Sequence, residues 1–462
     1  MRLRKAEINK KVKNNLEIKF IRQDLTNYSG LELIRKYFQL IKLNDLIKDK
    51  MREHKIKSDY PFYKMVLLLI TIFIVGIDRI SNVKYIEDDP LVKRLCELKK
   101  IPSRFTILRF LKFFTEEILN SFTEINSELL EIQFKKLKLK TLTIDLDGTV
   151  ISSRGKPELS KKGYNPIKKG ANSYFPLTAY IAQTGHFIKI KNRPGNVHDT
   201  NDSDNFVKEL IADLKKRHGS KVRLQIRHDG GFFSSKNFKV YEEKGLDYVS
   251  KVPFWRYPLF KKTIMENERW GKINSKINYF FKDLKLDSWD KERKFLFIRI
   301  EKDKDEIKED YQLNLFSPDC KKYKYSASCT NMNLNAKNLF KFMSGRSAQE
   351  KAIGELKNDF FFDKLPSQNY NANSAYQQLC MMSYNLMVSF GLDALNYKKI
   401  KKRKIISTRM YKNIRFKTLR FLIIYKAGII SHPNGKEVIG MTKNVASKKL
   451  FENILENLNL AI

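Results

Sequence analysis

Residues 141–150 read TLTIDLDGTV, and this stretch decides the fold of the chain. Its first half alternates apolar β-forming residues with polar ones, as a strand does. Because residues two apart on a strand share a face, Thr143, Asp145 and Asp147 lie on one side of it. Two carboxylates on one strand face, at the mouth of the following Gly-Thr turn, can hold a divalent metal ion. The alternative interpretation is that Asp147 only caps the turn through its side chain.

The string DxDGT after an apolar strand resembles the first motifs of two enzyme families. In haloacid-dehalogenase phosphohydrolases the resemblance implies that Asp145 is a covalent nucleophile and Asp147 an acid/base. In bacterial insertion-sequence transposases it implies that Asp147 is a metal ligand. The order of the elements that follow discriminates between the two.

After this strand the sequence predicts two strands joined by the tight turn Thr184-Gly185, and then alternating helices and strands. The predicted ranges are strands 175–183 and 186–191, helix 202–217, strand 222–229, helix 234–244 and strand 247–252. This is the order of the RNase H-like α/β fold, whereas a phosphohydrolase would alternate strands and helices after its first motif, where this chain has a three-strand meander. Asp147 and Asp229 fall on its first two catalytic places, while His228 faces the opposite side of its strand and is interpreted as structural.

The third acid is expected on a helix that begins near Ser344 and reads SGRSAQEKAIGELKNDFFF. At about 100° per residue, Arg346, Glu350 and Lys357 form one stripe. An adjacent apolar stripe would pack on the sheet: Ile353, Leu356 and Phe360. Glu355 lies on the far side, so Glu350 is the candidate. The alternative is an ordinary intrahelical pair between Arg346 and Glu350.

The spacing R-x3-E-x6-K matches the end of the Y-x2-R-x3-E-x6-K motif of cut-and-paste transposases, with Met343 at the Tyr position. Further blocks match as well: RPGN at 193–196, RHDGGF at 227–232 and NxNSAYQQLCMMSYNL at 371–386. The chain therefore resembles the transposase DDE domain group 1.

This resemblance implies a DNA transposase that cleaves the ends of a mobile element and joins the 3′-hydroxyls to target DNA. It implies that Asp147, Asp229 and Glu350 are catalytic and hold two Mg²⁺ ions, with Mn²⁺ as a substitute. Asp145 would then support these ligands or be a spare one. The remaining implied roles are phosphate binding by Arg346 and Lys357, double-stranded DNA (terminal inverted repeats and target) as partner, a homodimer on DNA, and a bacterial cytoplasmic, nucleoid-associated location.

The charge of the chain supports a polyanionic partner. Its 462 residues carry 90 Lys and Arg against 51 Asp and Glu, a formal charge of +39. Nucleic acid is the expected partner, although a Lys-rich proteome would also raise the charge. The four cysteines form no CxxC pair, which disfavours a zinc site, and the N-terminus does not read as a signal peptide. The apolar run 65–77 is shorter than the roughly 20 residues of a membrane span.

Five segments are expected: a helical DNA-binding domain 1–140, the first part of the core 141–253, a mostly β insertion 254–335, the second part of the core 336–395, and a basic C-terminal extension 396–462. Helices are predicted at 31–47, 63–77 and after an N-cap at Ser103 or Thr106. A strand pair is predicted at 416–425 and 428–431, and a helix at 446–460. Tryptophans of the insertion would stack on bases or lie in the core.

A basic helix after Ser103 is either a DNA-recognition helix or an amphipathic helix with a solvated face. Loop 152–173 and the Lys run 396–404 likewise either meet phosphates or are solvated. The candidate DNA contacts are Arg104, Arg109, Lys112, Arg193, Lys401, Lys402 and Arg403. Two other functions stay open: a phosphohydrolase, and a non-catalytic DNA-binding protein from a decayed element.

Overall fold

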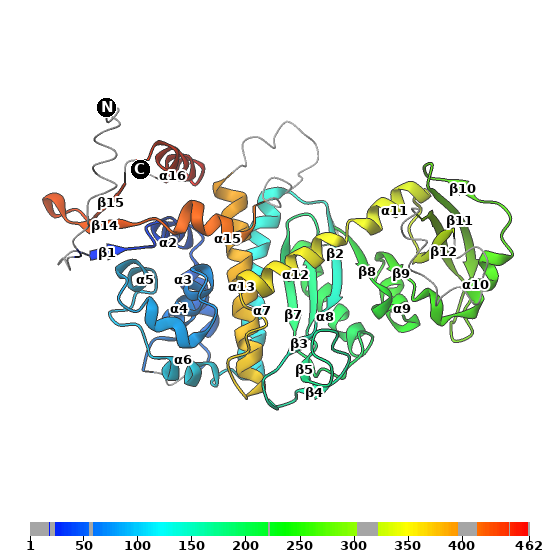
Figure 1. Ribbon diagram of the computed structural model, residues 1–462, viewed down its shortest axis with the longest axis horizontal. Coiled ribbons are helices and arrows are strands. Elements are labelled where there is room, and N and C mark those ends of the chain that lie inside the picture. The colour runs from blue at the N-terminus through cyan, green and yellow to red at the C-terminus, as the bar shows by residue number, and fades with distance from the viewer. Residues whose placement is uncertain are drawn as a thin grey trace.

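The computed structural model describes residues 18, 24–54, 59–219, 222–302, 322–395, 414–442 and 444–460. Figure 1 shows an elongated molecule with helices at one end, a large sheet in the middle and a β-rich part at the other end. The Lys run 396–404 lies outside the described residues.

The strand of the TLTIDLDGTV stretch, β2 (Thr141–Gly148), lies inside a nine-stranded mixed sheet. On one side it pairs antiparallel with β6 (Leu177–Ile181), which pairs antiparallel with β7 (His186–Lys191). On its other side it pairs parallel with β8 (Arg223–His228), which pairs parallel with β9 (Asp247–Lys251). The strand order β7-β6-β2-β8-β9 confirms the predicted RNase H-like fold.

Helices connect the parallel strands of this sheet, as a parallel pairing requires. They are α8 (Ser203–His218) before β8 and α9 (Ser235–Glu243) between β8 and β9. The alternation of β2 buries Leu142, Ile144 and Leu146 in the core beneath these helices. The opposite face of β2 is thereby left for its polar residues.

The predicted β insertion extends the same sheet. Its strands are β10 (Gly271–Lys272), β11 (Ile277–Leu284), β12 (Arg293–Glu301) and β13 (Tyr323–Thr330), and β13 pairs antiparallel with β9. Helix α10 (Pro258–Met265) precedes them and α11 (Ala336–Ser344) follows.

Two tryptophans of the insertion pack against aromatic residues of the insertion and of the neighbouring core segment. Trp289 is 5 % exposed and lies among Phe233, Phe295 and Phe238. The Trp270 ring lies edge-on to Phe280. The core interpretation therefore holds for Trp289, and the side chain of Trp255 lies outside the described residues.

The N-terminal region is helical, as predicted. Its α-helices are α2 (Leu31–Leu40), α3 (Leu43–Met51), α4 (Phe62–Ile74), α5 (Pro90–Leu95), α6 (Arg104–Leu111) and α7 (Glu116–Leu137). Ser103 caps α6, since its hydroxyl accepts from the Thr106 N–H. The single helix predicted at 31–47 is wrong, because Lys42 adopts a left-handed conformation that separates α2 from α3.

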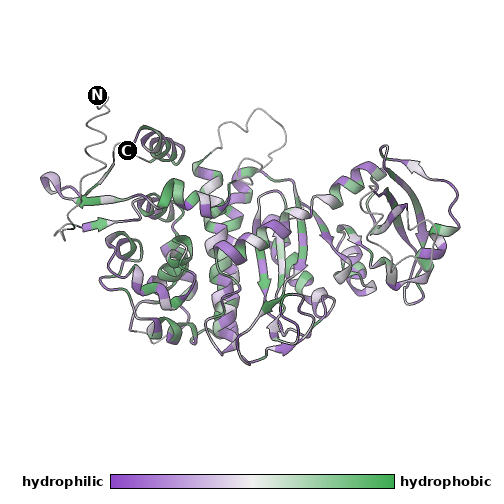
Figure 2. Ribbon diagram, in the orientation of Figure 1, coloured by the Kyte–Doolittle hydropathy of each residue, from purple (hydrophilic) through white to green (hydrophobic). Residues whose placement is uncertain are grey.

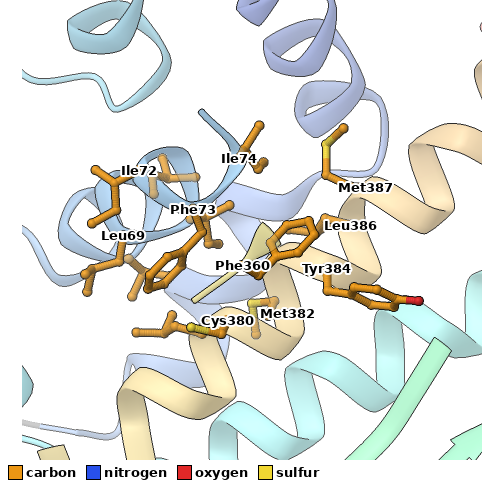
Figure 3. Close-up of a cluster of buried hydrophobic side chains, with 14 of the residues drawn as sticks. Leu69, Ile72, Phe73, Ile74, Phe360, Cys380, Met382, Tyr384, Leu386 and Met387 are labelled. Atoms are coloured by element: carbon orange, nitrogen blue, oxygen red, sulfur yellow. The ribbon is translucent and has the colours of Figure 1, made fainter. Parts of the chain in front are cut away.

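Helix α13 (Tyr370–Ala394) lies between the N-terminal helices and the central sheet. It is buried on nearly all sides and packs against α4, α6, α7 and β7 (Figure 1). Figure 3 shows three aromatic residues in one apolar cluster: Phe73 of α4, Phe360 just after Asp359, and Tyr384 of α13. Apolar residues likewise run along α4 and the central strands (Figure 2). Among the described residues, no helix is long and apolar enough to cross a membrane.

The prediction of a strand at 416–425 is wrong. This segment forms α15 (Phe416–Leu419) and a π-helical turn, η8 (Arg420–Ile424). The buried Arg420 guanidinium donates to the carbonyls of Phe73 and Ile74 at the end of α4, and to that of Asp359. These bonds satisfy carbonyls that a helix end leaves free, so tertiary contact selects the helical form.

The two ends of the described chain meet in a small sheet. Strand β14 (Gly428–Ser431) pairs with β15 (Val438–Met441) and with β1 (Asp24–Thr26), and helix α16 (Val445–Asn457) follows. The predicted strand 428–431 is confirmed, although its partners differ from the predicted one. The C-terminal segment thus packs on the N-terminal helices.

The loop after β2 carries a second small sheet, of strands β3 (Ile151–Ser152), β5 (Asn172–Tyr174) and β4 (Lys161–Lys162). The segments between these strands contain little regular structure. The basic side chains of the loop are exposed at the surface.

Candidate active site

The three predicted catalytic acids lie around one guanidinium group. Arg346 Nη2 is 3.1 Å from Asp147 Oδ1 and 3.5 Å from Asp229 Oδ2, and its Nη1 is 3.3 Å from Glu350 Oε1. The structure therefore brings together residues that are up to about 200 positions apart in the chain. They come from β2, from the end of β8 and from α12 (Ser347–Asp359).

Local structure explains how each acid reaches this place. Strands β2 and β8 are parallel neighbours, so their carboxyl ends, with Asp147 and Asp229, lie at the same edge. Asp229 Oδ1 accepts from the Gly231 N–H at 3.0 Å, which orients the carboxylate at the turn. Glu350 stands in the first turn of α12, and its side chain is 61 % exposed.

Helix α12 is fixed to β2 by Gln349, a residue that sequence reasoning missed. Its buried amide Nε2 donates to the Asp145 carbonyl at 3.0 Å and to Thr178 Oγ1 at 3.2 Å. The Thr178 hydroxyl itself donates to the Asp147 carbonyl at 3.0 Å. On the apolar side of α12, Leu356 is fully buried, as predicted. These contacts set the position of the neighbouring Glu350 against Asp147.

Asp145 has a different environment. It is fully buried, and Arg227 donates to both of its carboxylate oxygens, Nε to Oδ1 at 2.6 Å and Nη2 to Oδ2 at 2.7 Å. The same guanidinium donates to the Phe342 carbonyl and lies over the Phe342 ring. A nucleophile needs a free and accessible oxygen, so this pairing disfavours the phosphohydrolase alternative. It also favours the supporting role of Asp145 over that of a spare ligand.

A fourth carboxylate that the sequence reasoning missed, that of Asp199, lies beside the three acids. The pKa of Asp199 is raised to about 6, first by burial and then by the charge of Asp229. Burial raises the pKa of Asp147 to about 7, against the lowering effect of Arg346, and Asp229, Asp199 and Glu350 add to the rise. One guanidinium thus leaves the negative charge here only partly balanced. The position of Asp199 three residues after the RPGN block was the signal that could have found it.

Lys357 lies near Asp147, just beyond the carboxyl end of β2. Its ammonium donates to the Val150 carbonyl at 3.0 Å, and burial lowers its pKa. His228 is fully buried, packs against Phe232 and Phe238, and has its pKa lowered to about 4 by burial. This agrees with its structural interpretation. Met343, at the Tyr position of the motif, is a partly buried residue near the end of α11.

The expectation that Arg193 contacts DNA is contradicted. Its side chain is 5 % exposed and donates to the carbonyls of Phe175, His198 and Asn201. Burial lowers its pKa to about 10. Arg193 therefore braces the loop that carries Asp199: its Nε and Nη1 donate inside the protein, and its buried Nη2 has no acceptor among the described residues.

The other predicted DNA contacts on α6 face a basic groove. A cavity of about 570 Å³ separates α6 from loop 152–173 and from residues 363–366, and a second of about 830 Å³ adjoins it and contains Arg109 and Lys112. The basic residues that line the first cavity are Arg79, Arg104, Arg154, Lys168 and Lys364. The ring of Phe105, which lines both cavities, is 61 % exposed. The predicted contacts Lys401, Lys402 and Arg403 lie outside the described residues.

Within the described ranges, no group of three or more His, Cys, Asp or Glu side chains is gathered closely enough to hold a metal ion. The Arg346 guanidinium lies between the carboxylates of Asp147 and Asp229. The donor set itself consists of carboxylates alone, which is the set that Mg²⁺ and Mn²⁺ prefer.

Comparison with known proteins identifies the family. The family model of the transposase DDE domain group 1 matches residues 8–461. No curated protein sequence matches. Among solved structures, a piggyBac transposase synaptic complex with hairpin DNA is similar at 11 % identity and a TM-score of 0.43, over 96 % of this chain and 88 % of that chain. A Mos1 transposase paired-end complex is similar at 10 % identity and a TM-score of 0.18, over 53 % and 64 %. Because the family model spans nearly its full length, the chain belongs to the transposase DDE domain group 1 family.

Proposed function

We propose that this transposase cleaves the ends of its mobile element and joins the released 3′-hydroxyls to target DNA, in a cut-and-paste reaction. The observation that carries the proposal is the convergence of Asp147, Asp229 and Glu350 on Arg346. Phosphoryl transfer needs acids that bind metal and a cation that binds phosphate, and these four residues supply both.

Asp147, Asp229 and Glu350 would hold two Mg²⁺ ions, which Mn²⁺ can replace. The donor set fits, because it consists of oxygen ligands whose charge Arg346 balances only in part. The chemistry that these cations supply when bound is activation of water or of a DNA 3′-hydroxyl, and stabilisation of the leaving oxygen in an in-line displacement. Asp145 then has no ligand role: it holds Arg227, and through it the turn between α11 and α12.

Arg346 and Lys357 have the phosphate-binding roles in this proposal. The guanidinium of Arg346 presents a planar fork that suits a phosphate as well as a carboxylate. Its Nε is buried and has no hydrogen-bond partner among the described residues, so part of its donor capacity is unused. Lys357 lies beside the carboxyl end of β2, where the ammonium can reach a neighbouring phosphate as a point charge.

Double-stranded DNA would approach along the basic groove between α6 and loop 152–173. The five basic residues of the first cavity face one acid, Asp363, so the groove attracts a polyanion. It reaches Ser152 and Ser153, which follow directly on the β2 turn next to Asp147. A duplex in this groove would therefore lead to the acids. A homodimer that pairs two element ends completes the proposal.

The function is tested with a duplex that carries the DNA flanking this gene, incubated with the full chain. We expect cuts at the repeat ends with Mg²⁺ or Mn²⁺ and none once the metal ions are chelated, because the acids alone cannot activate water. Product ends are mapped by sequencing gels. Absence of cuts, together with metal-dependent hydrolysis of a small phosphate monoester, would instead favour a phosphohydrolase.

The groove is tested by its salt dependence. Each phosphate contact that is removed should lower the slope of log binding constant against log salt concentration by about 0.9. We expect Arg104→Glu and Lys168→Glu each to weaken binding of the end duplex and to reduce this slope, measured by fluorescence anisotropy from low to physiological salt. Arg52→Glu is the matched control, because this arginine is 81 % exposed at the end of α3 and lines neither cavity. Equal effects of all three variants would show general charge attraction and no groove.

A further inference from the structure

Asp199 stands on a firmly held loop between β7 and α8. The buried Arg193 guanidinium donates at 3.2 Å to the His198 carbonyl and at 2.7 Å to the Asn201 carbonyl, one on each side of Asp199. On the same loop, His198 Nδ1 pairs with the Thr200 hydroxyl at 3.1 Å. The backbone of Asp199 is therefore fixed, and the place of its carboxylate is a property of the fold.

That carboxylate lies between the two backbone segments that carry the first two catalytic acids. A Cβ atom placed on Gly148, the residue after Asp147, would lie 2.3 Å from Asp199 Oδ1. A Cβ atom on Gly231, two residues after Asp229, would lie 2.2 Å from Asp199 Oδ2 and 3.1 Å from Asp229 Oδ1. Such contacts are closer than atoms can approach, so a larger residue at either position would displace the Asp199 carboxylate, and at Gly148 it would also meet the Phe175 ring. An oxygen of Asp199 and one of Asp229 thus lie close to the same position, the space beside the Gly231 Cα atom.

Asp199 forms an ion pair with Arg193, but one of its carboxylate oxygens is left without a hydrogen bond within the described part of the chain. Its Oδ1 is buried and accepts no hydrogen bond from any residue that the structure describes. The Nη2 of Arg193 is 3.9 Å from this oxygen, beyond hydrogen-bond length, and is itself without an acceptor. A buried carboxylate oxygen without a donor is costly, and a bound cation removes that cost.

We propose that Asp199 is a fourth carboxylate ligand of the catalytic divalent cations, shared with Asp147 and Asp229. This inference rests on the proposed function. It explains why a glycine follows each of the two acids so closely: both make space for a carboxylate that arrives from a third segment. The competing interpretation is that Asp199 only braces Arg193 and thereby the loop.

Binding of Mn²⁺ to the full chain separates the two interpretations without the need for activity. Free Mn²⁺ is measured by electron paramagnetic resonance during titration of the wild type, Asp199→Asn, Asp147→Asn and Asp202→Asn. We expect Asp199→Asn to weaken Mn²⁺ binding by about 10–100-fold, the range that loss of a supporting group at a metal site produces. Asp202→Asn is the control, since Asp202 lies three residues further along and pairs with Lys191 at the surface. It should bind as the wild type does.

A metal switch gives a second readout that does not depend on the amount of folded protein. In Asp199→Cys, a thiolate ligand prefers a softer ion than Mg²⁺. We expect the ratio of DNA cleavage with Cd²⁺ to cleavage with Mg²⁺ to rise at least about 10-fold over that of the wild type. A brace of Arg193 has no reason to change this ratio.

The outcomes are distinct for the inference and for the function on which it rests. Wild-type Mn²⁺ binding by Asp199→Asn, with no switch in Asp199→Cys, overturns the role of Asp199 if Asp147→Asn still loses the ion. Unchanged Mn²⁺ binding in Asp147→Asn as well, with no DNA cleavage by the wild type, overturns the proposed metal-dependent function itself.

Discussion

Glu350→Gln is expected to abolish DNA cleavage, with a loss of at least about 10³-fold, while binding of the end duplex stays within about threefold of the wild type. Removing one charged ligand withdraws several kcal/mol of transition-state charge stabilisation, and each tenfold in rate corresponds to about 1.4 kcal/mol. The fold should survive, because the Glu350 side chain is 61 % exposed and its ion pair within the described part of the chain is with Arg346. The measurement is single-turnover cleavage of a labelled duplex at saturating protein.

Glu355→Gln on the same helix is the matched control. Glu355 faces away from the acids and lines a separate cavity with Tyr384 and Arg415, where burial raises its pKa to about 7. We expect this variant to cleave at nearly the wild-type rate. Full activity of Glu350→Gln would remove Glu350 from the catalytic set, and equal losses in both variants would point to damage of α12 as a whole.

The central strands and the meeting of Asp147, Asp229 and Glu350 at one place could be predicted because their signals are local. Alternation in residues 141–147 gives β2 and its polar face, and helical spacing separates Glu350 from Glu355 before any contact is known. Asp199 has no such periodic signal. Its place depends on how a loop, braced by Arg193, folds over Gly148 and Gly231, and that is a tertiary property.

The error at 416–425 has a related cause. A short apolar run fits a strand and a buried helix equally well, so periodicity alone cannot assign it. What decides is Arg420, whose buried guanidinium finds carbonyl acceptors at the ends of α4 and α12, far away in the chain. The pairing of β1 with β14 likewise joins segments about 400 residues apart, and local sequence carries no record of that contact.

Arg227→Met is expected to destabilise the protein by about 3–5 kcal/mol, the usual effect of leaving one partner of a buried ion pair without the other. Asp145 is fully buried, and both of its oxygens accept from Arg227. Loss of the guanidinium also removes its bond to the Phe342 carbonyl, next to the turn that leads to Arg346. The measurement is urea unfolding followed by circular dichroism, with DNA cleavage recorded below the transition.

Arg223→Met on the same strand provides the control. Arg223 pairs with Asp247, but its side chain is 63 % exposed, and exposed pairs contribute no more than about 1 kcal/mol. The double variant Asp145→Leu/Arg227→Met should regain part of the lost stability, because it leaves no buried charge alone. If instead Arg227→Met were as stable as Arg223→Met, the pair with Arg227 would not be what stabilises the buried Asp145, and its supporting role would be wrong. Asp145 and Asp147, two residues apart on one strand face, thus differ in their partners: Arg227 of the neighbouring strand donates to both oxygens of Asp145, whereas Asp147 shares Arg346 with Asp229 and Glu350.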